Sequence, residues 1–338
     1  MMNKLRMGRP ATLALVCVVL VLGPGCAQRT TASAEGSASG SVAGSVAELR
    51  EPALEQIRAS AKSEDPILRA NALEAIEAVP GEAAALAEAA VEDVNQVVRF
   101  AALMLIGDLK IEELGEAALA RREDESYHVR AAAIHAAKAT GQDVDASPLS
   151  RLVMAPDPGL RSNVAIVLGR MGDASAVPML REAAAAPLPR AAEVQHALLR
   201  IQVAEALVQL GDERARSAIR AAAYSHHDEV RVLALSMMGR LEDRRMMPAM
   251  EYMVHDQPME IRLAAAEGLA RLGSGLGLEA MLEGARSRSA PVRAQAAFGL
   301  GLIPDAQAAR ALKRLLEDDS EQVRLSAAAA IVKATAGE

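Results

Sequence analysis

The sequence is poor in aromatic residues and in cysteine. Its 338 residues include no Trp, three Tyr and two Phe, so few side chains are available to stack on nucleic-acid bases or sugar rings. The two cysteines, Cys17 and Cys26, both lie near the start of the chain. The remaining sequence has no thiol to oxidise, which excludes a stabilising disulfide there.

Basic residues are also fewer than acidic residues. The chain has 37 Lys and Arg against 44 Asp and Glu. Without Lys4, Arg6 and Arg9, which belong to a segment that we expect to be removed, 34 basic residues remain and the net charge is −10. A nucleic-acid partner requires a cationic surface, and so does charge-driven binding to anionic lipid, so we expect neither.

No long hydrophobic run is present. The apolar stretch 11–22 is too short for a membrane-spanning helix, which needs about 20 residues. It follows a basic start and precedes the small residues 23–25, an arrangement typical of an export signal. A cysteine directly after small residues resembles a bacterial lipobox, with Gly23 at the position where leucine is expected. The resemblance implies a signal peptide at 1–25 and lipidation of Cys26; cleavage after residues 32–34, or an uncleaved anchor, are the alternatives.

Residues 26–47 are rich in Ser, Gly and Ala and have nothing to bury, so we expect a flexible tether. A coil of this length spans on the order of 25 Å.

One pattern recurs along the rest of the chain. In the segment 256–273, DQPMEIRLAAAEGLARLG, an acid is followed six positions later by an arginine, and apolar residues at helical spacing lead to a final glycine. The pattern occurs nine times, with steps of 31 residues between arginines except for one of 30 and one of 39. This period predicts a solenoid, because each unit buries its apolar face only against its neighbours. The repeated arginines are Arg69, Arg99, Arg130, Arg161, Arg200, Arg231, Arg262, Arg293 and Arg324.

The strings at 93–107, 124–137 and 228–239, which read D…VR…AA…LG, resemble HEAT repeats, in particular the short HEAT-like repeats of phycobilin lyases. The resemblance covers residues 48–338 and implies an all-α fold, an α-α superhelix of the HEAT/armadillo type with about nine helix pairs. The second helix of each pair would line the concave side. Helices pack about 8–10 Å apart, so nine pairs predict an elongated arc of roughly 80–90 Å.

We interpret the repeated arginines as a structural ladder. Acids stand six positions before several of them, as at Asp93, Asp124, Asp256 and Asp318, or four before, as at Asp65 and Asp157. A planar guanidinium can bridge such carboxylates in its own and in the next repeat. A ligand site is the alternative.

The step of 39 residues marks an irregular repeat. Residues 191–210 are expected to form one helix about two turns longer than its counterparts, projecting from an edge of the array. Insertions in repeat proteins often lie at a binding rim, although an insertion without a role remains possible.

The positions two, five and nine after each arginine should form a solvent stripe along the concave groove. It mixes apolar residues with isolated charges, which is typical of a protein-contact surface but also of an ordinary half-exposed helix face. The candidate binding residues are Met104, Asp108, His135, Ile166, Arg170, Gln209, Arg240, Arg271 and Phe298.

No catalytic or metal-binding pattern stands out. The six histidines are spread over four units, and His196 and His227, which share a column, should lie about 10 Å apart. Four methionines between 246 and 253 could ligate copper, but their columns indicate core packing. A nucleophile elbow and a glycine-rich phosphate loop are also missing from the sequence. We therefore expect no catalytic residue, metal or cofactor.

Together these observations predict a non-catalytic lipoprotein of the bacterial cell envelope, anchored through lipid only, with its solenoid outside the cytoplasm. It would act as a scaffold that binds a protein or peptide partner. The alternatives are a structural envelope spacer and, by the resemblance to phycobilin lyases, a lyase-type enzyme or its accessory subunit. The sequence predicts no particular oligomeric state.

Overall fold

The computed structural model describes residues 46–188, 191–255 and 257–336. In these ranges the chain forms eighteen α-helices, α2–α19, and no strand, which confirms the predicted all-α solenoid. None of these helices has the length and hydropathy that a bilayer span requires. The predicted signal peptide 1–25, Cys26 and nearly all of the tether 26–47 lie outside the described residues.

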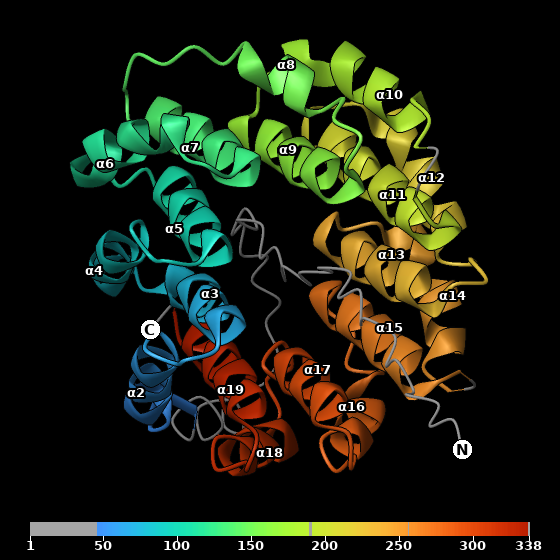
Figure 1. Ribbon diagram of the computed structural model, residues 1–338. Helices are drawn as coiled ribbons and strands as arrows, with labels where there is room; N and C mark the ends of the chain where they lie inside the picture. Colours follow the sequence, from blue (N-terminus) through green and yellow to red (C-terminus); the bar gives the residue numbers. More distant parts are fainter. Residues whose placement is uncertain (1–45, 189–190, 256, 337–338) are drawn as a thin grey trace, which may run out of the picture.

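The helices form two layers around a ring, nine on the inside and nine on the outside (Figure 1). The inner helices are α3 (Pro66–Ala75), α5 (Gln96–Leu109), α7 (Tyr127–Ala139), α9 (Pro158–Met171), α11 (Glu193–Gln209), α13 (Asp228–Arg240), α15 (Met259–Arg271), α17 (Ala290–Leu300) and α19 (Glu321–Ala334). The outer helices are α2 (Arg50–Ser60), α4 (Pro80–Ala90), α6 (Gly115–Ala120), α8 (Pro148–Leu152), α10 (Val177–Ala185), α12 (Arg216–Ala222), α14 (Met247–Met253), α16 (Leu278–Gly284) and α18 (Ala306–Leu315).

Short 3₁₀ turns lengthen several helices of both layers. They are η1 (Ile76–Ala78), η2 (Glu112–Leu114), η3 (Arg121–Glu123), η4 (Ala174–Ala176), η5 (Glu213–Ala215) and η6 (Arg244–Met246).

Local sequence explains where the helices begin. Eight inner helices start three residues before the repeated arginine, and polar side chains cap several of them. Asp65 accepts the Ile67 N–H at 2.8 Å, and Asn95 accepts the Val97 N–H at 2.9 Å. On the outer side, Asp173 accepts the Ser175 N–H at 2.9 Å. These caps satisfy backbone donors that the helices leave free at their first turns.

The hydrophobic core lies between the two layers and continues from repeat to repeat. The fully buried side chains include Ile57 on an outer helix and Leu103 and Ile106 on an inner one. Each inner helix packs against the inner helix of the next repeat, for example α5 against α7 and α13 against α15. Alanine is frequent on these faces, and its small side chain allows close approach of the helices.

The array closes on itself, so the prediction of an elongated arc was wrong. Helix α19 packs against α2 and α3, and the first and last repeats lie side by side (Figure 1). Polar contacts join the two ends as well: the Arg324 Nε donates to Gln56 Oε1 at 3.2 Å, and Ser63 Oγ donates to Glu321 at 3.4 Å. The stacking distance alone predicts an arc. A rotation of one ninth of a circle between successive repeats brings the ninth repeat back beside the first.

The irregular repeat differs from the prediction in length. Helix α11 has 17 residues against 13 in α13, so it is longer by about one turn and not by two. It begins at Glu193, and the remaining extra residues belong to the connection before it. Leu188 in this connection is buried and its carbonyl lies 2.7 Å from His196 Nε2, which holds the segment against the fold instead of extending the helix.

Candidate functional site

The inner helices bring polar residues from different repeats together. Several side chains at positions five and nine after the repeated arginines contact one another between inner helices, and we call these positions the inner face. Small residues make room for them: a Cβ at Gly107 would lie 2.5 Å from the ring of His135, so only glycine allows this histidine to lie across α5.

Asp108, His135 and Arg170 meet on three consecutive inner helices, α5, α7 and α9. His135 Nε2 lies 3.1 Å from Asp108 Oδ1, and Arg170 Nη1 lies 3.3 Å from Asp108 Oδ2. The His135 and Arg170 side chains are only 4% and 8% exposed. Nε and Nη1 of Arg170 are buried and have no well-aligned hydrogen bond from the described residues. Asp108 therefore contacts both a ring nitrogen of His135 and the guanidinium of Arg170, and it holds the two side chains together.

Two glutamates of the first repeat extend this group. Burial and the negative charge of Asp108 raise the pKa of Glu77 to about 7, although Arg170 and Lys333 oppose the shift. Burial and the charge of Glu77 also raise the pKa of Glu74 well above its usual value. Lys333 lies on α19, so the closure of the ring gives the first repeat a cation from the last. We call Glu77, Asp108, His135 and Arg170 the inner-face cluster.

The opposite side of the inner face is held by arginine–glutamate pairs. Arg240 binds Glu205 Oε1 through Nη2 at 2.7 Å, and Arg271 binds Glu267 at 2.9 Å. Ser236 Oγ donates to Glu267 at 3.0 Å. The Arg271 guanidinium also lies 5.3 Å from the ring centre of Phe298, within range of a cation–π contact. These groups satisfy one another through their hydrogen bonds and ion pairs.

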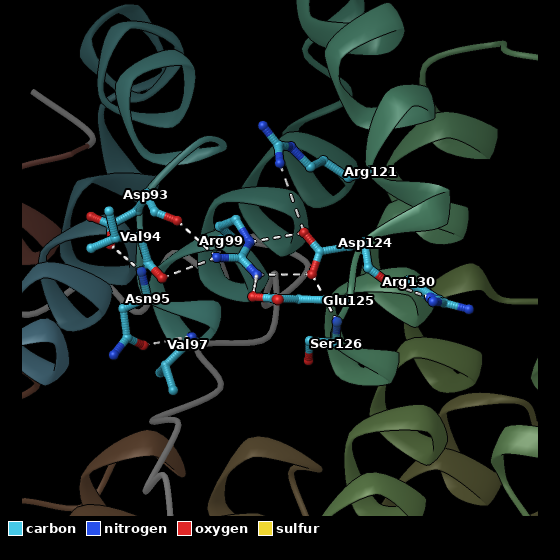
Figure 2. Close-up of polar contacts among 10 residues, drawn as sticks. All are labelled: Asp93, Val94, Asn95, Val97, Arg99, Arg121, Asp124, Glu125, Ser126 and Arg130. Atoms are coloured by element: carbon cyan, nitrogen blue, oxygen red, sulfur yellow. Dashed lines mark hydrogen bonds and ion pairs between the residues drawn. The ribbon is translucent and has the colours of Figure 1, made fainter.

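The repeated arginines lie at the first turn of the inner helices, where Arg99 shows the full set of contacts (Figure 2). Its Nε and Nη2 donate to both carboxylate oxygens of Asp124 in the next repeat, at 2.9 and 2.8 Å, and its Nη1 donates to the carbonyl of Asp93 at 2.9 Å. Burial opposes the ionisation of Asp124, but the bonds from Arg99 and from the Ser126 N–H outweigh it and lower the pKa of Asp124. The arginine thus ties one repeat to the next.

The same geometry recurs where the next repeat offers an acid six positions before its arginine. Arg69 binds Asp93 and Arg293 binds Asp318, both through two nitrogens. In its own repeat the arginine binds backbone carbonyls and not the carboxylates four positions upstream, because Asp65 and Asp157 cap helices.

Other repeats use different partners for the arginine. Arg262 binds Glu283, Arg231 binds Gln257, and Arg161 binds carbonyls of the following outer helix. Arg130 binds the carbonyl of Asp124, and Arg324 binds Gln56 across the closure. Arg200 is exposed, and Asp256 lies outside the described residues.

One group with metal-ligand geometry lies away from the inner face. Glu193 at the start of α11 comes close to His226 and His227, which precede α13, and one ligand atom of each lies within 4.8 Å of the others. Sequence reasoning missed this group, because it compared histidines within one column of the repeat and gave no weight to Glu193 in the irregular repeat.

The family is decided by the sequence match. A family model described as HEAT repeats matches residues 117–198, 149–231 and 278–336, which together are just over half of the chain. The chain belongs to the HEAT-repeat family. A search of the curated proteins finds no match to its sequence.

Several solved structures resemble this HEAT-repeat ring at low sequence identity. The complex of CpcE and CpcF of phycocyanin lyase from Nostoc sp. PCC7120 is 19% identical, with a TM-score of 0.39, over 72% of this chain and 91% of that one. Human deoxyhypusine hydroxylase, in complex with glycerol, is 15% identical, with a TM-score of 0.38, over 89% and 99%. The protein YibA from E. coli is 15% identical, with a TM-score of 0.33, over 88% and 97%. Likeness at this level shows the fold alone.

These comparisons correct the predicted function. The chain was expected to be a non-catalytic lipoprotein scaffold and not an enzyme, but two of the three structures named are of enzymes, a lyase and a hydroxylase. The physical reason is that a repeat array needs no sequence motif to assemble acid–base groups: Asp108, His135 and Arg170 come from three repeats. The first structure is a complex of two chains, which agrees with the expectation of a protein partner.

The HEAT-repeat ring carries all nine predicted binding residues on its inner helices, but not as an open stripe. His135 and Phe298 are buried, and Arg170, Arg240 and Arg271 lie in the charge pairs described above. Met104 and Ile166 are partly buried and Gln209 is exposed. Neighbouring inner helices approach closely enough that side chains expected to face solvent contact each other instead. Their role in binding stays a prediction.

Sequence reasoning missed Glu74, Glu77 and Lys333. Glu74 and Lys333 occupy the same columns, five and nine after their arginines, so the repeat register could have identified them. The influence of Lys333 on Glu77 depends on the closure of the ring, which no column of the repeat reveals.

Proposed function

We propose that this HEAT-repeat protein is an enzyme, or a subunit of one, of the lyase type, and that the inner-face cluster supplies its acid–base groups. The observation that carries the proposal is the contact of Asp108 with both His135 and Arg170, beside a carboxyl group, Glu77, whose pKa is raised to about 7. A carboxyl group whose pKa lies near neutral pH, such as Glu77, is suited to move a proton to and from a substrate.

Each member has a role that its surroundings support. Asp108 accepts from His135 and holds the imidazole in one orientation, which leaves the other ring nitrogen for a proton transfer. Arg170 has buried donors without well-aligned partners, so it suits a carboxylate or another anionic group of a substrate. Met104 and Ile166, on the two helices that carry Asp108 and Arg170, offer partly exposed apolar surface to the body of such a molecule.

The name of the phycocyanin lyase complex supplies the reaction class to test first, and the inner-face cluster carries the proposal. An open-chain tetrapyrrole with carboxylate side chains is a suitable probe, since its absorbance changes on binding. We expect the purified full chain to bind it, Arg170→Met to weaken binding by about tenfold or more, and His135→Gln to reduce turnover more than binding.

Glu279→Gln, on the outer helix α16 and exposed, is the matched control and should behave as wild type. Binding that is unchanged by both inner-face variants would contradict the assigned site. No change in tetrapyrrole absorbance with the wild type, alone or with a candidate partner chain, would contradict the lyase class.

We also propose that residues 1–25 direct export and that Cys26 carries the lipid that anchors the chain to a membrane of the bacterial envelope. The basic start, the short apolar run and the small residues before Cys26 support this proposal. Labelling of cells with a fatty-acid analogue should mark the wild type and Cys17→Ser but not Cys26→Ser. Equal labelling of all three would contradict it.

A further inference from the structure

Three side chains that can bind a metal ion, none of them part of the inner-face cluster, converge at the start of α11. Glu193 is the first residue of α11, while His226 and His227 lie in the connection between α12 and α13. Glu193 Oε1 is 3.7 Å from His226 Nε2, and the two imidazole rings lie with their centres 4.0 Å apart. Two imidazoles and one carboxylate therefore present their donor atoms to a common point.

These donors are available. Nε2 of His227 is buried and makes no hydrogen bond within the described residues, although a buried imidazole nitrogen normally has a partner. The Glu193 and His226 side chains are 76% and 72% exposed, so both can change rotamer at low cost. A bound ion at this point would give the buried nitrogen its missing partner.

The chemistry of the set selects the kind of ion. Neutral imidazole with one carboxylate suits Zn²⁺ and its neighbours in the first transition row, and not Ca²⁺ or Mg²⁺, which take oxygen ligands. Zn–N and Zn–O bonds of about 2.0–2.2 Å place the ligand atoms of a tetrahedral site about 3.4 Å apart. The three donor atoms lie within 4.8 Å of one another, so they must approach each other by roughly 1 Å to bind the ion. We propose that Glu193, His226 and His227 bind one divalent transition-metal ion such as Zn²⁺, with a coordination position left for water or a further ligand.

The irregular repeat explains why the group occurs here. Helix α11 begins seven residues before its repeated arginine, whereas each of the other inner helices begins three before. Glu193 lies in this additional turn, next to the connection that carries the two histidines. Elsewhere in residues 46–188, 191–255 and 257–336 no such group of ligands is brought together. The site therefore gives a role to the inserted residues, independent of the proposed lyase function.

The test is a titration of the purified full chain, first treated with a chelator, with Zn²⁺ by calorimetry and with Co²⁺ by visible absorbance. We expect one ion per chain and the absorbance bands of a four- or five-coordinate Co²⁺ site. Glu193→Gln and His226→Ala should each weaken Zn²⁺ binding by at least about tenfold. Binding of Zn²⁺ by the wild type should also weaken as the pH is lowered, because protons compete with the ion for its ligands.

His255→Ala is the matched control, because this exposed histidine lies in the corresponding connection one repeat later. It should leave the affinity unchanged, and circular dichroism should show the same helix content in all variants. The proposal is overturned if Glu193→Gln and His226→Ala bind Zn²⁺ as tightly as the wild type. It is equally overturned if the wild type shows no binding at about 1 mM Zn²⁺.

Discussion

Arg50 at the start of the first described helix donates a hydrogen bond of 2.7 Å to the hydroxyl of Thr335, 285 residues later and just beyond the last helix. The same guanidinium lies 3.3 Å from the carbonyl of Val332. Thr335 is buried and donates in turn to the carbonyl of Ile331. Together with the packing of α19 on α2 and α3, these bonds make the first and last repeats neighbours in the ring.

The first prediction concerns this closure. Arg50→Ala removes a charged donor from partly buried acceptors, so the free energy of unfolding should fall by about 1–2 kcal/mol. The amides of α2 and α19 should exchange with deuterium faster, while those of α9 should not change. Arg122→Ala removes an exposed arginine of the third repeat and serves as the control. If Arg50→Ala changed the exchange rates of α2 and α9 equally, the closure would contribute nothing to the local stability of α2.

The second prediction concerns the buried pair of Arg99 and Asp124, whose side chains are only 6% and 3% exposed. Arg99→Ala leaves the carboxylate buried without its partner and should lower the free energy of unfolding in urea by about 3–5 kcal/mol. Glu51→Gln removes the exposed partner of Arg58 and should cost less than about 0.5 kcal/mol. Similar losses in the two variants would contradict a special role for the repeated arginines.

The third prediction is that the stability contributed by Asp318, which pairs with Arg293, depends on pH in the acid range. The hydrogen bonds from Arg293 lower the pKa of Asp318 below its usual value of 3.8. The stability that Asp318 contributes is therefore present above about pH 4 and is lost as the pH falls through the lowered pKa. Asp318→Asn should reduce the free energy of unfolding by about 1–3 kcal/mol at pH 7 and by much less at pH 2. A difference that stays constant with pH would count against this account.

The fourth prediction has the opposite sign and concerns Glu77. Its pKa is raised from 4.5 to about 7, so the folded state holds this proton more tightly than the unfolded chain. The resulting stability is fully present below about pH 4.5 and is lost as the pH rises through 7. Glu77→Gln should therefore raise the free energy of unfolding at pH 8 by roughly 1–3 kcal/mol and change it little at pH 4.

An infrared difference spectrum gives a second readout of Glu77. The wild type should show a carboxylic acid band that disappears on raising the pH from 6 to 8, and Glu77→Gln should lack it. Glu88→Gln, on the exposed side of α4, is the control and should keep the band. A wild-type spectrum without a titrating carboxyl group in this range would exclude Glu77 as an acid–base group.

The repeat register was predictable because every repeat carries the same local signals. The arginine spacing predicts the register of the repeats, and eight inner helices begin three residues before their arginine. The start of α11 was not predictable in this way, because the tertiary contact of Leu188 competes with helix propensity at residues 191 and 192. The closure of the ring depends on small rotations between successive repeats, which add up over the whole array. These rotations cannot be recognised from the residues at any single position of the repeat.

The candidate site was predictable only as a set of positions. Asp108, His135 and Arg170 were identified as inner-face residues from their phase relative to the arginine, but their mutual contact depends on how three helices pack. Glu193 and His226 do not occupy the same position relative to their repeated arginines, since Glu193 belongs to the inserted turn. The two side chains come together only in the folded chain.

Because the last repeat is the spatial neighbour of the first, the order of the units along the polypeptide has little structural meaning. Joining the two ends and opening the chain at any other connection would give a circular permutant with the same set of neighbours. A tenth copy, in contrast, would have no place to dock. Duplication of a single module, the usual route by which such arrays lengthen, is therefore closed to this molecule unless the circle first breaks.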